Sequence, residues 1–273
     1  MVSQITNSLY GLADIYNQNN LTLFQTLQRL ASGKKVLTPS DDLTGYFRAQ
    51  DLEVQYDKYS ALNSDMQEWK SAMDIASTAG GEVYSGLERM QQLSQLYDTA
   101  DDSTKAAYTS EYNQILSDVT HTINTTYYGR SSLLNATDTI KKIDLIPDAS
   151  SDDQHLLINP GEAVTADHLD ALIPVGAETI ADVGDHIDDA IIDVKTFQGT
   201  ISAYSTGLQS HITITGSIMQ NTQSVQSSIT NIDQMQEMIN YIQEDIRNQT
   251  SIAMMAQANV SQRAILYLYG LKP

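Results

Sequence analysis

The sequence has no cysteine among its 273 residues, which excludes disulfides and metal sites built from thiolates. Its five prolines and fourteen glycines are few for an all-β protein, which needs many turns, so the composition favours long helices. Basic residues are scarce too, because 15 Lys and Arg stand against 34 Asp and Glu, for a formal net charge of -19. This negative charge argues against nucleic-acid binding through phosphate neutralisation.

Long apolar runs are also missing, since none approaches the roughly 18 residues that a membrane-spanning helix requires. The N-terminus lacks the basic segment followed by an apolar block that marks a Sec-type signal. We therefore expect no membrane insertion. Export through a dedicated apparatus that reads an unstructured N-terminus stays compatible with this pattern.

Charge divides the chain into three parts. Residues 1–142 carry 17 acidic and 11 basic residues, residues 143–194 carry 13 acidic residues and no Lys or Arg, and residues 195–273 carry four of each. The middle part also holds three of the five prolines. We interpret it as a short, solvated, non-helical or mixed insertion between two helical arms.

The first arm has helical periodicity up to about residue 30. Its apolar stripe consists of Ile5, Leu9, Leu12, Tyr16, Leu23, Leu27 and Leu30. Gly33 is placed to end this helix, and Ser40 or Asp41 to accept a hydrogen bond at the start of the next. The pattern predicts two helices joined by a loop of about ten residues.

Two more helices are expected in this arm. The second has an apolar stripe from residue 52 to residue 93, and the pair Gly80-Gly81 is not expected to end it. The third, with apolar positions from Tyr108 to Ile123, should turn back on the second.

The last arm has an apolar stripe from residue 197 to residue 267 without proline. The stripe predicts one helix of roughly 75 residues that spans about 110 Å, and we expect the arm as a whole to start near residue 178. Such a rod cannot bury its stripe within one globule, so we expect it to pack on the first arm and on other copies of the chain. In the middle part, residues 139–146 and 154–159 predict a β-hairpin, and residues 166–173 and 178–194 predict helices.

No catalytic motif is present: the sequence has no HExxH, no glycine-rich phosphate loop, no GxSxG and no cysteine nucleophile. The most metal-like cluster is Asp182, Asp185, His186, Asp188 and Asp189. It lacks the glycine loop of a calcium site, so we interpret it as a solvated acidic face. The adjacent carboxylates Asp41 and Asp42 are explained by helix capping. We predict no catalytic, cofactor or metal site, and a protein that is not an enzyme.

Several motifs resemble the bacterial flagellins. Residues 27–36 (LQRLASGKKV) are similar to the family's "RLSSGKRI", and Asp41-Asp42 followed by Gly45 is similar to "DDAAG". Residues 128–135 (YGRSSLLN) resemble "FNGxxLLNG". Near the other end, residues 256–259 (AQAN) and 265–269 (ILYLY) resemble "AQAN" and "ILSLL". The short middle resembles the minimal form of the family, and residues 205–211 are similar to short alphaproteobacterial flagellins.

The resemblance implies a mainly α fold, in which long antiparallel helices form a terminal coiled coil and an elongated helical bundle. A short acidic insertion containing a β-hairpin would lie outermost. The expected parts are the N-terminal helix and loop of the filament core, 1–42; the first bundle part, 43–138; the insertion, 139–177; the second bundle part, 178–232; and the C-terminal core helix, 233–273.

The implied function is that of a structural subunit that self-assembles into the flagellar filament for swimming. Implied partners are other copies, other flagellins, hook-associated and cap proteins, and the flagellar export apparatus with its chaperone, so the protein would be secreted. Two alternatives stay open. One is a hook-filament junction protein, because residues 38–42 (TPSDD) resemble its "NPSDD". The other is a surface-binding or enzymatic variant with its chemistry in residues 143–194.

Subunit packing is expected along the apolar stripes of both arms. The candidates are Ile5, Leu9, Leu12, Leu23, Leu27, Leu30, Ile239, Ile242, Ile246, Ala256, Val260 and Leu266. Residues 87–111 resemble the helix of many flagellins that contacts an innate immune receptor, with Arg89, Leu93 and Glu111 at matching positions. The surrounding residues diverge, so we expect weak or absent signalling.

Overall fold

Helices dominate the structure, a computed structural model that describes residues 2–135, 141–148, 154–175 and 178–268. The helices are α1 (Val2–Ser32), α2 (Leu43–Tyr97), α3 (Asp102–Thr125), α4 (Ala166–Ala171), α5 (Gly184–Thr230) and α6 (Gln234–Leu268). Short strands form two antiparallel pairs, β1 (Tyr127–Tyr128) with β2 (Ser131–Ser132), and β3 (Lys141–Asp144) with β4 (His155–Ile158). The mainly α fold with a β-hairpin in the middle is confirmed.

The chain forms two compact units, which are considered separately. The first unit, here the terminal unit, comprises residues 1–54 and 222–273, and the second, the central unit, comprises residues 55–221. The division falls within α2 and within α5. Each unit therefore takes segments from both arms of the sequence.

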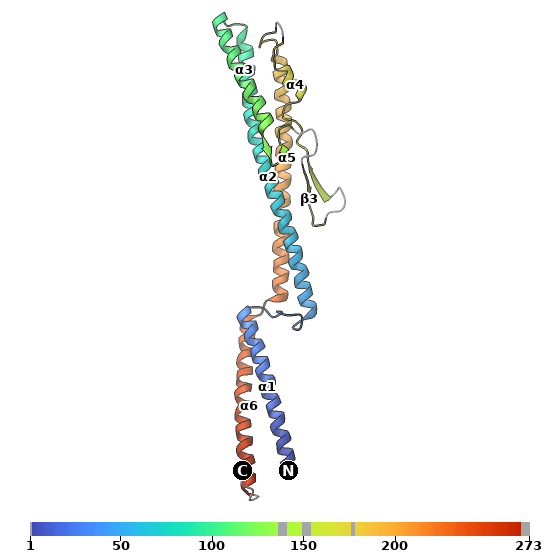
Figure 1. Cartoon of the computed structure of the whole chain (residues 1–273), viewed down its shortest axis with the longest axis vertical. Coiled ribbons are helices and arrows are strands. Elements are labelled where there is room, and N and C mark those ends of the chain that lie inside the picture. The colour runs from blue at the N-terminus through green and yellow to red at the C-terminus, as the bar shows by residue number, and fades with distance from the viewer. Residues whose placement is uncertain (1, 136–140, 149–153, 176–177, 269–273) are drawn as a thin grey trace. The chain divides into compact units, whose positions relative to one another are not determined.

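In the terminal unit, α1 and α6 lie side by side and antiparallel (Figure 1). As predicted, α1 ends at Gly33, whose φ of 70° suits the left-handed conformation and whose N–H donates to the Arg29 carbonyl at 2.8 Å. The predicted cap of the next helix was wrong. Asp42 accepts from the Gly45 N–H at 2.9 Å, while Asp41 accepts from two N–H groups earlier in the loop, those of residues 37 and 38.

The single long helix predicted for the last arm is also wrong, because residues 231–233 separate α5 from α6. Asp233 accepts from the N–H groups of Met235 at 3.0 Å and Gln236 at 3.1 Å, and so caps a new helix. The break lies against the loop after α1, where the Ile232 N–H donates to the Gly33 carbonyl at 3.1 Å. This arm begins at Gly184 and not near residue 178.

The central unit packs α2, α3 and α5 around an apolar core (Figure 1). Fully buried side chains come from all three helices and include Met66, Met73, Leu87, Tyr112, Ile123, Ile187 and Phe197. Gly86 lets α2 and α3 approach closely, since a Cβ at this position would lie 2.6 Å from Cγ2 of Val119. As predicted, Gly80-Gly81 does not interrupt α2.

The acidic insertion is less solvated than its charge pattern predicts. In β3 the exposed residues Lys142 and Asp144 alternate with the fully buried Ile143, because successive side chains of a strand point to opposite faces. Beyond the hairpin, the Tyr112 hydroxyl of α3 donates to the Leu172 carbonyl at 2.8 Å, and burial raises the pKa of this tyrosine. The insertion thus contributes apolar side chains to the core of the central unit.

Candidate assembly surface

In the described part of the chain, no group of three His, Asp or Glu side chains is placed to hold a metal ion, and this includes the acidic cluster. Asp182 instead accepts from the N–H and hydroxyl of Thr179 at 2.7 and 2.8 Å, and these hydrogen bonds lower its pKa. Asp188 accepts from the Gln91 amide and so links α5 to α2. In the part of the chain that the structure describes, no helix is both long and apolar enough to cross a bilayer.

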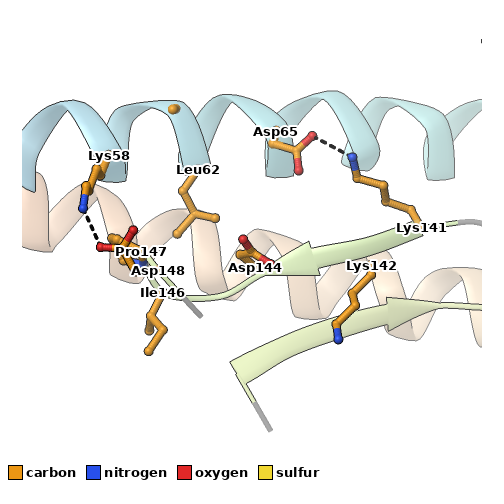
Figure 2. A pocket seen from close by; sticks show the side chains of 10 residues that line it. Lys58, Leu62, Asp65, Lys141, Lys142, Asp144, Ile146, Pro147 and Asp148 are labelled. Carbon is orange, nitrogen blue, oxygen red and sulfur yellow. Dashed lines mark hydrogen bonds and ion pairs between the residues drawn. The ribbon is translucent and has the colours of Figure 1, made fainter. Parts of the chain in front are cut away.

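A pocket in the central unit lies between α2 and the segment containing β3, and Figure 2 shows its lining. Lys58 pairs with Asp148, and Lys141 pairs with Asp65 at 3.6 Å. Lys141 also lies 5.7 Å from the centre of the Trp69 ring. Both ion pairs connect α2 to the insertion. These four charged side chains therefore have partners within the chain.

The most extensive unpartnered feature is a set of exposed apolar side chains on α1 and α6, here the apolar surface. Their exposed fractions run from 44% to 77%. The set consists of Ile15, Leu21, Phe24, Leu27, Met235, Met238, Ile239, Ile242, Ile246, Ile252, Met254 and Val260. Exposed large apolar side chains in this number on one pair of helices typically mark an interface.

The contact between α1 and α6 is polar where it is most buried. Among the described side chains of these helices, the buried ones are Thr26, Asn248 and Ser251, and all three are polar. The Asn19 amide donates to the Ser251 hydroxyl at 3.2 Å, and the Asn248 amide donates to Oδ1 of Asn20 at 2.7 Å. We call Asn19, Asn20, Asn248 and Ser251 the polar layer.

Charged groups continue this contact toward the loop. The Arg29 guanidinium lies 3.5 Å from Asp41 and 3.8 Å from Glu237, which lies in the first turn of α6. The pKa of Asp41 is lowered, first by its hydrogen bond from the Thr38 N–H and then by further donors and the Arg29 charge. Each of these contacts stays within the chain and leaves the apolar surface uncovered.

Sequence reasoning missed the polar layer because it followed apolar residues only. The signal was present as a second, polar stripe with helical spacing, in which Asn19 and Thr26 are seven residues apart and Asn248 and Ser251 are three apart. Following it would have shown which face of each helix meets the other within one chain.

The predicted packing residues fall into three groups. Leu27, Ile239, Ile242, Ile246, Ala256 and Val260 are exposed in the single chain. Leu12, Leu23 and Leu30 are half-buried between or beside the two helices. The side chains of Ile5, Leu9 and Leu266 lie outside the described residues. Their contacts with other subunits stay a prediction.

The three positions matched to a receptor contact differ in accessibility. Arg89 pairs with Glu111 across α2 and α3, with Nε and NH2 each 2.7 Å from the carboxylate. Leu93 is fully buried in the core. A protein docking on this face would meet the ion pair, and it would reach Leu93 only by opening the helices.

Comparison with known proteins gives matches at both ends of the chain. The family model described as the bacterial flagellin N-terminal helical region matches residues 6–139, and the C-terminal helical region matches residues 185–268. A flagellin from Halalkalibacterium halodurans is 26% identical over 252 residues, which is 89% of this chain and 90% of the relative. A flagellin from Listeria innocua is 24% identical over 267 residues, 92% of this chain and 93% of the relative.

Two further matches are a filament core protein and a solved structure. The flagellar filament 33 kDa core protein of Treponema phagedenis is 22% identical over 270 residues, covering 91% of this chain and 93% of its own length. Among solved structures, Bacillus cereus flagellin matches 58% of this chain and 88% of that chain, at 17% identity and a TM-score of 0.38.

Proposed function

The chain belongs to the bacterial flagellin family, and from that premise we propose that it is a structural subunit that self-assembles into the flagellar filament for swimming. Relatives named as flagellins or as a filament core protein match about nine tenths of the chain. The observation that carries the proposal is the apolar surface on α1 and α6, which a soluble monomer would leave in water.

Burial of this surface between neighbouring subunits supplies the driving force. Removing one Ile, Leu, Phe or Met side chain fully from water contributes about 1.5–3 kcal/mol. Several such side chains per subunit therefore offset the roughly 4–15 kcal/mol that association costs in lost motion. Self-assembly follows, with the polar layer facing inward and the apolar surface facing other copies.

The finer assignments follow from the family. The subunit has a structural role without catalysis, leaves the cell through the flagellar export apparatus with a chaperone, and resides in the extracellular filament. There it contacts its own copies, other flagellins, and hook-associated and cap proteins. Contact with the innate receptor is weak, since Leu93 is buried and Arg89 is paired with Glu111.

Electron microscopy of the purified protein, after addition of salt or of filament seeds, tests the proposal. Long homopolymeric filaments are the expected result. Short assemblies that join only to hooks would instead support the junction protein that residues 38–42 resemble. Persistent monomers under both conditions would overturn the filament proposal.

A further inference from the structure

The polar layer places amide and hydroxyl side chains in the contact between two helices, where such groups gain little from burial. Asn248 is 9% exposed, and its Oδ1 is buried without a hydrogen-bond partner in the described structure. Leucine at the same positions would strengthen the pair, because buried amides stabilise less than packed apolar side chains. The arrangement therefore needs a role other than strength.

We infer that the polar layer sets the register of α1 against α6. In the observed alignment the Asn19 amide meets Ser251 and the Asn20 carbonyl oxygen meets Asn248. A slip of one heptad would place Asn20 opposite Met255 and Asn248 opposite Leu27, with no cross-helix partner for either amide. Single buried asparagines fix alignment in helix pairs in this way, by making each wrong alignment costly.

The apolar residues of the contact cannot supply this discrimination. Leu23 and Leu30 of α1 are half-buried and seven residues apart, so a slip of one heptad places one leucine where the other was, with little change in chemistry. The loop contact between Gly33 and Ile232 holds only one end of the pair. Asn20 lies thirteen residues from Gly33, or about 20 Å along the helix, where a second constraint is needed.

Register matters for assembly, and this step rests on the proposed function. The apolar surface takes residues from both helices, and the register fixes how far those of one helix are displaced along those of the other. A slip of one heptad displaces them by about 10 Å. Neighbouring subunits would then meet a different surface, so the polar layer determines which filament contacts are presented.

Introduced cysteine pairs report the register directly, because the chain has no cysteine of its own. Asn19→Cys with Ser251→Cys reports the observed alignment, and Asn19→Cys with Ala258→Cys reports the slipped one. Both reporters are placed in the full chain with Asn20 and Asn248 retained, and again with Asn20→Leu and Asn248→Leu. Gln18→Leu with Gln249→Leu is the matched control, since both glutamines are exposed.

Intrachain disulfide formation is followed on dilute monomers, and on filaments where they form. With Asn20 and Asn248 retained, the 19–251 pair should oxidise at least ~10-fold faster than the 19–258 pair, whose sulfurs the native alignment keeps apart. The Asn20→Leu, Asn248→Leu chain should bring the two rates close together while retaining its helix content. The glutamine control should keep the original ratio.

Two results would overturn the inference: equal rates with Asn20 and Asn248 retained, or an unchanged ratio after the leucine substitutions. The second would assign the register to the loop contact alone. Both readouts work on monomers, so a chain that fails to form filaments would refute the proposed function and leave this result standing.

Discussion

The two units use amphipathic helices in opposite ways. The central unit buries a large apolar core, in which Met66, Tyr112 and Phe197 are almost fully buried. The terminal unit buries Thr26, Asn248 and Ser251 between its helices and leaves many of its large apolar side chains in solvent. The comparison teaches that an apolar stripe identifies a helix that must be covered, without saying whether the same chain covers it.

The difference also separates folding from assembly. A core like that of the central unit can be stable in a monomer, because side chains of the same chain cover it. We expect the terminal unit to gain most of its apolar burial through other copies, which would bind and stabilise the folded helices by mass action. Substitutions in the two units should therefore have separable effects.

The largest expected effect comes from placing a charge on the apolar surface. Leu27→Asp or Ile239→Asp should abolish polymerisation, because burying an unpaired carboxylate between subunits costs several kcal/mol. The thermal unfolding of the central unit should stay unchanged. Sedimentation after seeded assembly measures the first effect, and circular dichroism the second.

Gln249→Asp provides the control for this experiment, since it adds the same charge at an exposed polar position of α6. It should polymerise close to normally. Normal filaments from both the Leu27 and Ile239 variants would show that these side chains face away from neighbouring subunits.

The converse experiment shortens one side chain in the core of the central unit. Leu87→Ala should lower the free energy of unfolding by about 2–5 kcal/mol, since Leu87 is fully buried and its removal leaves a cavity. Below the new melting temperature, the critical concentration for polymerisation should be unchanged. Leu96→Ala is the matched control, because Leu96 lies on the same helix at 48% exposure. Equal destabilisation by both variants would contradict the core that we describe.

A smaller effect is expected where α5 gives way to α6. Asp233→Ala removes the acceptor for the N–H groups of Met235 and Gln236, which should cost about 1 kcal/mol of local stability. Hydrogen exchange in residues 234–237 should quicken several-fold, with no change in the central unit. Asp233→Asn, which keeps an acceptor oxygen, should restore most of the protection. Unchanged exchange in the alanine variant would show that the loop contacts alone hold the start of α6.

The sequence predicts the helices and the hairpin well because each depends on a local pattern. The end of α1 at Gly33 and the alternation of β3 are both readable from a few neighbouring residues. The break at residues 231–233 was missed because Ile229, Ile232 and Met235 keep the stripe in phase across it. Periodicity alone therefore does not reveal the helix break, although Asp233 caps the new helix there.

Contacts between distant segments could not be predicted in the same way. The candidate packing residues were chosen for being apolar, and this property does not distinguish the half-buried Leu23 from the exposed Leu27. The ion pair between Lys58 and Asp148 joins segments ninety residues apart, so no local spacing encodes it. The polar layer is partly predictable. The spacing of its residues within each helix is local, but the pairing of α1 with α6 is not.

The smallest expected effect concerns how the central unit holds its insertion. His168 of α4 lies 2.7 Å from Asp193 of α5, and this hydrogen bond, helped by the charges of Asp193, Asp189 and Asp167, raises the pKa of the histidine. Asp193 also accepts from the Thr165 N–H at 3.1 Å, so it anchors the start of α4. Protonated His168 therefore favours the docked α4.

The sign of the pH dependence follows from the raised pKa. Because the histidine binds its proton more tightly in the folded chain than in the unfolded one, its contribution is complete below about pH 6.5. It is lost as the pH rises through the folded-state pKa. Hydrogen exchange in residues 166–171, corrected for intrinsic rates, should thus quicken modestly between pH 6 and pH 9. The effect is small because the histidine side chain is 35% exposed and solvent screens the pair. His168→Gln should flatten the profile, and a profile that persists in this variant would assign the pH dependence to another group.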